Sequence, residues 1–193
     1  MTISPLPPTH LLTIGEYAAL GEDEHGRTEL MEGNLVMSPS PTPDHNIAIF
    51  RIAQQLDGQL PDGAEVISDV DVDLQLVPPD GPGTSRRPDL VLLRADARRR
   101  VREEGGLLRA AEVLVAVEIL SPGSRRIDNI VKRAEYADAG IPHYWVVDLE
   151  PAATLRACRL EPGGAGYRDA EPVTGTFVTD EPFPLRIELD RIS

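Results

Sequence analysis

The segment EVLVAVEILSPGSRRIDNIVKRAEYADAGIPHYWVVDLE (residues 112–150) contains the most apolar part of the chain. The length and β-branched content of residues 112–122 predict a central strand that is covered on both faces. Ser124 is expected to cap a helix, and Gly140 supplies the residue that ends it. Residues 143–150 then predict a second buried strand. The segment therefore predicts the order strand, helix, strand.

The chain on either side of this segment supplies further strands and helices. Residues 64–78 alternate between apolar and polar side chains, which predicts a half-buried strand with an acidic outer face. Gly33-Asn34 between two alternating runs predicts the turn of a β-hairpin over residues 27–39. The remaining expected elements are a helix at 13–20, a helix at 44–60 capped by Asp44, a loop or frayed helix at 95–110, and strands at 89–94, 154–160 and 184–190.

Together these elements predict one domain over residues 1–193, in which helices pack against a mixed β-sheet. That arrangement belongs to the α/β or α+β class. The expected core spans about residues 44–150, with the hairpin 27–39 added at the N-terminal side and a β addition at residues 151–193.

The composition is that of an ordinary globular protein, with 41% apolar and 26% charged residues. No apolar run reaches about eighteen residues, so no transmembrane helix is expected. Residues 1–20 have neither a basic start nor a long apolar run, so no secretory signal is expected and the cytoplasm is the expected location. The single cysteine, Cys158, excludes an internal disulfide and is expected to be a buried small side chain.

The charge is uneven along the chain. The formal net charge of −13 argues against a general nucleic-acid binder. Residues 86–133, however, hold twelve Lys and Arg against seven Asp and Glu. This local excess of positive charge fits either a solvated, arginine-rich loop or a positive patch beside an anionic substrate.

Lysine occurs once, at Lys132, whereas the other eighteen Lys and Arg residues are arginines. A lysine can be a compositional accident in such a chain. At a site of chemistry, however, its compact ammonium is not equivalent to a guanidinium. Lys132 is therefore a candidate site residue only if other evidence points to the same position.

Glu118 provides such evidence, because it interrupts the apolar run of residues 112–122. An unpaired carboxylate there would be costly, so Glu118 is expected to be a ligand, a catalytic acid or half of a structural ion pair. Asp89 stands at the entry to another strand. Two converging carboxylates, with the carbonyl of Ile119 as a third oxygen, would suit Mg²⁺ or Mn²⁺. A nearby ammonium would complete a site for metal-assisted phosphodiester hydrolysis.

These residues lie in motifs that resemble the Uma family (Uma-two type) of restriction endonuclease domains, within the PD-(D/E)XK nuclease superfamily. The resemblance extends from about residue 11 to residue 191. It implies a restriction-endonuclease-like α/β core with the catalytic motif on a β-hairpin. The matching stretches are LTIGEYAAL (12–20), RTELMEGNLVMSPSPTPDH (27–45), RRPDLVLL (86–93), VLVAVEILSPGSRRIDNIVKRAEYADAGIPHYWVVD (113–148) and PFPLRIELD (182–190).

The resemblance also implies which residues form the site. The proline-aspartate pair of the superfamily falls on Pro88 and Asp89, and its second acid falls on Glu118. Leu120 stands where the superfamily carries its lysine, and in the Uma family a lysine on the next helix takes that role. Here that position is Lys132.

A helical wheel leaves two placements open for Lys132. It puts Lys132 with Asp128, Glu135 and Tyr136 on the polar side, opposite an apolar face of Ile127, Ile130, Val131 and Ala134. Lysine has a long stem that can reach around to a site, which is the placement we favour. A solvated lysine paired with Asp128 is the competing picture.

The remaining candidates have weaker support. Glu29 and Glu32 lie in one hairpin strand three residues apart, so at most one can face the site, and Glu29 is favoured. His45 matches a family histidine but is expected to be a surface neighbour of a helix cap. Packing, rather than catalysis, is expected of Tyr136 and Trp145, and a solvated outer face is expected of Asp69, Asp71 and Asp73.

Two functions from different classes remain. The first is a Mg²⁺-dependent endonuclease acting on DNA, which we expect to be a homodimer because symmetric dimers are the commonest oligomers. The second is a non-catalytic interaction module with a nuclease fold, favoured by the net charge of −13 and by Leu120.

Overall fold

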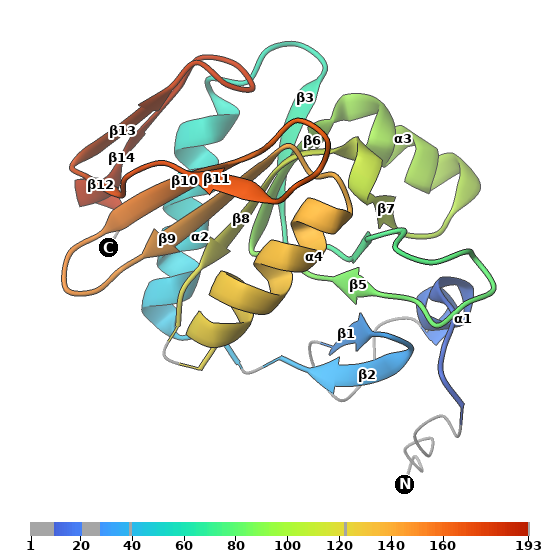
Figure 1. Cartoon of the computed structure of the whole chain (residues 1–193). Helices are drawn as coiled ribbons and strands as arrows, with labels where there is room; N and C mark the ends of the chain where they lie inside the picture. Colours follow the sequence, from blue (N-terminus) through green and yellow to red (C-terminus); the bar gives the residue numbers. More distant parts are fainter. Residues whose placement is uncertain (1–9, 21–27, 39, 122, 193) are drawn as a thin grey trace, which may run out of the picture.

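The computed structural model describes residues 10–20, 28–38, 40–121 and 123–192. Its largest sheet has the strand order β11-β10-β9-β8-β6-β3, and β12 pairs with β10 (Figure 1). Within it β8 and β9 are parallel and β6 and β8 are antiparallel. These strands are β3 (Ala64–Ser68), β6 (Leu90–Arg94), β8 (Val113–Ile119), β9 (His143–Asp148), β10 (Thr154–Leu160), β11 (Tyr167–Asp169) and β12 (Val173–Thr174).

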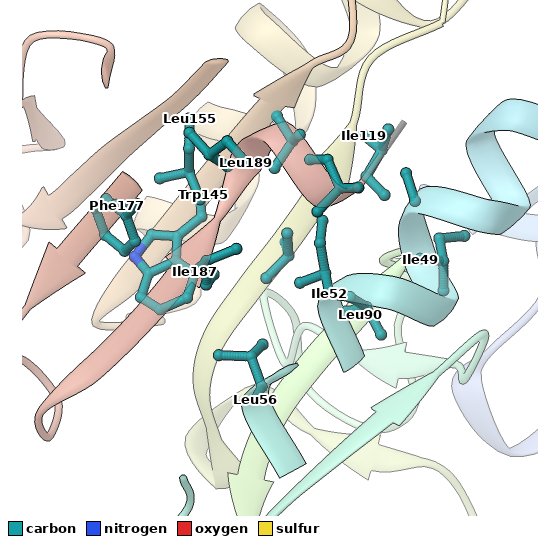
Figure 2. Close-up of a cluster of buried hydrophobic side chains, with 14 of the residues drawn as sticks. Ile49, Ile52, Leu56, Leu90, Ile119, Trp145, Leu155, Phe177, Ile187 and Leu189 are labelled. Carbon is teal, nitrogen blue, oxygen red and sulfur yellow. The ribbon is translucent and has the colours of Figure 1, made fainter. Parts of the chain in front are cut away.

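The two larger apolar core clusters contain side chains from opposite faces of this sheet. On one side the helix α2 (Pro43–Asp57) and the hairpin of β13 (Thr176–Thr179) and β14 (Leu185–Glu188) pack against the strands. Trp145 lies in this cluster, edge-on to Phe177 with ring centroids 5.1 Å apart (Figure 2). The second cluster includes Tyr136 and Ala137 from the helix α4 (Arg133–Asp138), as well as Ala97 from α3 (Ala95–Glu104).

A smaller sheet, with the order β2-β1-β5-β4-β7, carries the predicted N-terminal hairpin. The hairpin turn is formed by Glu32 and Gly33, which both adopt positive φ, one residue earlier than the predicted Gly33-Asn34, because Asn34 already pairs with Met31 as the first residue of β2. A Cβ on Gly33 would lie only 2.7 Å from Leu11 Cβ, so this glycine also allows close packing. The strands are β1 (Thr28–Met31), β2 (Asn34–Met37), β4 (Val72–Asp73), β5 (Ser85–Arg86) and β7 (Leu108–Arg109). Arg27 and Pro39 of the predicted hairpin lie outside the described residues.

Most predicted elements are confirmed, and three need correction. The expected strand 64–78 is divided into β3 and β4, which belong to different sheets, because the chain turns at Asp69 with φ +57. The loop or frayed helix expected at 95–110 contains the regular helix α3. Thr42, rather than Asp44, caps α2, since its hydroxyl accepts a hydrogen bond from the His45 amide.

The helix after the central strand contains a π-helical segment. Ile127–Lys132 form this π-helical segment, and α4 continues from it without a break. Pro122, at the end of the predicted strand 112–122, lies outside the described residues. π-helical turns occur frequently at functional sites.

The remaining elements are short helical segments. The short helix α1 (Ile14–Leu20) and the 3₁₀ turns Ala110–Glu112 and Leu189–Arg191 complete the fold. No helix in the described part of the chain is long and apolar enough to span a membrane.

Candidate active site

Seven charged residues border one cavity of about 310 Å³. They are Glu29, Arg86, Arg87, Asp89, Glu118, Asp128 and Lys132. The cavity lies where the hairpin β1–β2, the start of β6, the end of β8 and the π-helical segment meet. The predicted site residues, which are distant in sequence, therefore border the same cavity.

The strand register explains why Asp89 and Glu118 meet. β6 and β8 are antiparallel, with Leu90 opposite Val117, so one further step places Asp89 beside Glu118. The main chain confirms this placement, since the Ile119 amide donates a 2.7 Å hydrogen bond to Asp89 Oδ2. The alternation of β8 thus delivers Glu118 to the cavity between core residues.

His45 also contacts Asp89, which corrects its expected place at the surface. It lies in the first turn of α2 and is buried. Its Nε2 is 3.1 Å from Asp89 Oδ2. The α2 cap therefore brings an imidazole to the same carboxylate oxygen that the Ile119 amide reaches.

Lys132 reaches the cavity floor rather than solvent. Its Nζ donates a 2.9 Å hydrogen bond to Glu118 Oε1 and lies 3.1 Å from Glu29 Oε1. Asp128 Oδ1 lies further away, at 3.7 Å from the same nitrogen. Lys132 is only 7% exposed, so the placement at the site that we favoured is confirmed and the solvated alternative is wrong.

The surface that this helix buries is its polar side. Asp128, Lys132 and Tyr136 are buried, whereas Ile130 is 62% exposed. Ile127, Val131 and Ala134 are exposed as well. The wheel grouped these residues correctly, and the side that the helix buries is the polar one, contrary to the usual burial of an apolar face. The physical reason is that the helix faces the charged groups of Glu118, Glu29 and Arg86 in this region.

Burial and mutual charge govern the ionisation of the site. Burial raises the pKa of Glu118 well above its usual range, more than the Lys132 charge lowers it. Burial lowers the pKa of Lys132, but the charges of Glu118 and Glu29 outweigh it and the pKa is raised overall. For Glu29 burial raises the pKa, yet the Lys132 charge and the Arg87 amide bring it below the usual value. Lys132 is therefore a permanent cation opposite Glu29.

An outer layer of ion pairs supports Glu29. Arg86, only 2% exposed, donates from Nη1 to Glu29 Oε2 at 3.0 Å and from Nε and Nη2 to both oxygens of Glu135. The Arg87 amide donates a 2.9 Å hydrogen bond to Glu29 Oε1. No signal in the sequence marked Arg86, because it is one of eighteen arginines.

Tyr136 was expected to pack rather than to contact the site, and it does both. Its ring lies edge-on to Tyr144, with centroids 5.3 Å apart. Its hydroxyl donates a 2.8 Å hydrogen bond to Glu118 Oε1, the oxygen that Lys132 also contacts. The spacing of four residues between Lys132 and Tyr136 was the signal available in the sequence, since such residues share a helix face.

The other candidates lie elsewhere. Glu32 occupies the hairpin turn and is exposed. The aspartates of residues 69–73 do not border the cavity, and Asp71 instead pairs with Arg87, with Oδ2 2.7 Å from Nη2. Trp145 packs in the core as expected. Cys158 is buried as expected, and burial raises its pKa to about 12.

The carboxylates of the cavity suit a hard cation that takes few protein ligands. Among the described residues, Asp89 makes its hydrogen bonds through Oδ2, and Glu118 makes its hydrogen bonds through Oε1. Ile119 borders the same cavity. In the described ranges, no three His, Cys, Asp or Glu side chains are grouped to hold a metal ion. Mg²⁺ commonly uses one or two carboxylates and keeps several waters, so this donor set fits it.

Comparisons with known proteins agree with the fold. A crystal structure described as "a putative nuclease belonging to DUF820 from Anabaena variabilis ATCC 29413" superimposes with a TM-score of 0.67 over 94% of this chain and 97% of that chain, at 16% identity. Such a likeness shows that the two chains share a fold. None of the curated proteins compared with the chain matches it. The model of the Uma2 family, described as "Putative restriction endonuclease", matches residues 14–191, and the chain therefore belongs to that family.

Proposed function

We propose that the protein is an endonuclease that uses Mg²⁺ or Mn²⁺ to hydrolyse phosphodiester bonds in DNA. The observation that carries this proposal is the meeting of Asp89, Glu118 and Lys132 in one cavity. The family description and the name of the structural neighbour support the reaction class.

Each residue has a separate role in this proposal. Asp89 and Glu118, with the carbonyl of Ile119, would hold the cation, which supplies Lewis-acid activation of water and phosphate when bound. Lys132 places a fixed positive charge where negative charge develops on the phosphoryl oxygens. Glu29 keeps the Lys132 ammonium in place and Tyr136 keeps the Glu118 carboxylate in place, since each contacts its partner directly. His45 and the Ile119 amide orient Asp89.

One observation favours the second candidate, a non-catalytic interaction module. The arginine-rich region 86–133 was a possible positive patch, but many of its cations are paired within the chain. Ion pairs of 2.5–3.4 Å in this region join Arg94 to Asp96, Arg98 to Glu65, Arg100 to Glu112, Arg125 to Asp148 and Arg133 to Asp169. Binding to DNA would have to rely on other contacts or exchange these pairs for phosphates.

A cleavage assay separates the two candidates. Purified protein is incubated with plasmid and with single-stranded DNA, in Mg²⁺, in Mn²⁺ or in EDTA, alongside Asp89→Asn. The endonuclease is supported if cleavage needs the metal and is lost in the variant. Metal-independent DNA binding without cleavage supports the interaction module.

We also propose that the protein acts as a homodimer, because a nuclease that cuts both strands of a duplex benefits from two sites. Light scattering should give twice the mass of the 193-residue chain. A mass equal to one chain at micromolar concentration contradicts this proposal without affecting the first.

A further inference from the structure

Asp128 is a buried carboxylate that the proposed reaction does not use. It is 1% exposed, and its Oδ2 is buried without a hydrogen-bond partner. Its only ion pair among the described residues is the long 3.7 Å contact from Oδ1 to Lys132 Nζ. A buried carboxylate oxygen without a donor is costly, so the free protein holds an acceptor that a ligand can satisfy.

The position of Asp128 points to the cavity as the source of that ligand. Asp128 borders the cavity together with Asp89 and Glu118. Burial raises the pKa of Asp128, and the charges of Asp89 and Glu29 also raise it, against the opposing effects of the Lys132 charge and of a hydrogen bond with Ser124. The π-helical segment presents Asp128 and Lys132, four residues apart, to this same hollow.

The charges around the cavity favour a cation as the ligand. Four carboxylates border the cavity: Glu29, Asp89, Glu118 and Asp128. Arg86 and Arg87 border it as well, but each also makes two hydrogen bonds to a further carboxylate, Glu135 and Asp71. Lys132 is therefore left to balance most of the negative charge of the cavity.

The geometry favours a contact through water over direct ligation. Across the described part of the chain, no three acidic, histidine or cysteine side chains are grouped around one point. Mg²⁺, in addition, retains several waters in its coordination shell, and these waters are hydrogen-bond donors that a free carboxylate oxygen accepts.

We propose that Asp128 is a third carboxylate of the cation site, and that its Oδ2 accepts hydrogen bonds from the water shell of a divalent ion held by Asp89 and Glu118. This inference rests on the proposed function, because it assumes the ion. It assigns to Asp128 a share of the metal affinity rather than a purely structural pairing with Lys132.

Calorimetry of Mn²⁺ binding to the full chain tests this inference. Loss of an outer-shell carboxylate typically costs 10- to 100-fold in metal affinity, so Asp128→Asn and Asp128→Ala should weaken binding by that factor. Asp138→Asn is the matched control, because it removes the same charge from an exposed position on the same helix. Its affinity should stay within twofold of wild type.

The outcomes separate the inference from the proposed function. If Asp89→Asn and Glu118→Gln abolish binding while both Asp128 variants bind as wild type does, the inference is wrong and the metal site stands. If wild type does not bind Mn²⁺, the metal site and the inference both fail. Thermal unfolding of the free proteins adds a second readout: a purely structural Asp128 predicts a lower melting temperature in Asp128→Asn, whereas relief of an unpaired buried carboxylate predicts no loss.

Discussion

Lys132 Nζ lies 2.9 Å from Glu118 Oε1, in a contact where the lysine is 7% exposed and the glutamate is 3% exposed. A buried ion pair is weak evidence for stability, because the cost of desolvating two charges offsets their attraction. In this cavity the carboxylates also outnumber the ammonium. The arrangement is better explained as a site kept ready for a cationic ligand than as a contribution to folding.

Glu118→Gln should therefore stabilise the metal-free protein, by about 1 kcal/mol or more. The amide oxygen of glutamine can still accept from Lys132 and Tyr136, while Glu29 and Asp128 remain to pair with Lys132. Urea unfolding in EDTA measures the change. Glu161→Gln, at an exposed position, is the control and should stay within about 0.5 kcal/mol of wild type. A destabilised Glu118→Gln variant would contradict this view of the cluster.

The stability gained in Glu118→Gln should depend on pH. Burial raises the pKa of Glu118, so the folded protein keeps this proton to a higher pH than the unfolded chain does. The stabilisation that comes from protonated Glu118 is present in full below the pKa of this residue in the unfolded chain. It is lost as the pH rises through the pKa of Glu118 in the folded protein. The advantage of the glutamine variant should thus be larger at about pH 8 than at about pH 5. An advantage that does not change between these two pH values would argue against the raised pKa.

Tyr136→Phe should destabilise the protein by about 1–2 kcal/mol. The substitution keeps the buried ring and its contact with Tyr144 but removes the hydroxyl that donates to Glu118 Oε1. Urea unfolding measures the loss. Tyr17→Phe is a useful comparison, because its hydroxyl donates to the Thr28 carbonyl away from the cavity. If Tyr136 positions the site, only Tyr136→Phe should also weaken Mn²⁺ binding.

The sequence predicted the strand–helix–strand unit and the meeting of Asp89, Glu118 and Lys132 in one place. It did not predict the orientation of the helix. Periodicity groups the residues that share a helix face without stating which face is buried. The usual rule buries the apolar face, and it failed here because Arg86, Glu29 and Glu118 supply charged partners from strands distant in sequence. Arg86 escaped notice and His45 was expected at the surface for the same reason, since their partners Glu135 and Asp89 are brought near only by the fold. The break at Asp69 was likewise hidden, because alternation continues through it.

The exposed apolar side of the π-helical segment gives a direct check of that orientation. Ile130→Lys should change the free energy of unfolding by no more than about 0.5 kcal/mol, because Ile130 is 62% exposed. A fully buried Ile130, as the wheel suggested, would instead make the variant strongly destabilised. Ile52→Ala in the α2 core is the contrasting control and should cost about 2–5 kcal/mol. Both values come from urea unfolding under the same conditions.

Lys132→Arg should fail in cleavage although it keeps the positive charge. The guanidinium is larger and planar, whereas the ammonium is a compact charge held 2.9 Å from Glu118 and 3.1 Å from Glu29. Loss of one such electrostatic donor typically costs about 10²–10³ in rate. Because Lys132 is buried, the substitution should also cost about 1–3 kcal/mol of stability through overpacking, so each assay is run well below the melting temperature of the variant. Arg126→Lys, at an exposed position just before the π-helical segment, is the matched control and should cleave as wild type does. A folded Lys132→Arg variant with wild-type activity would show that the cavity needs only a positive charge, and that the single lysine of this chain is an accident of composition.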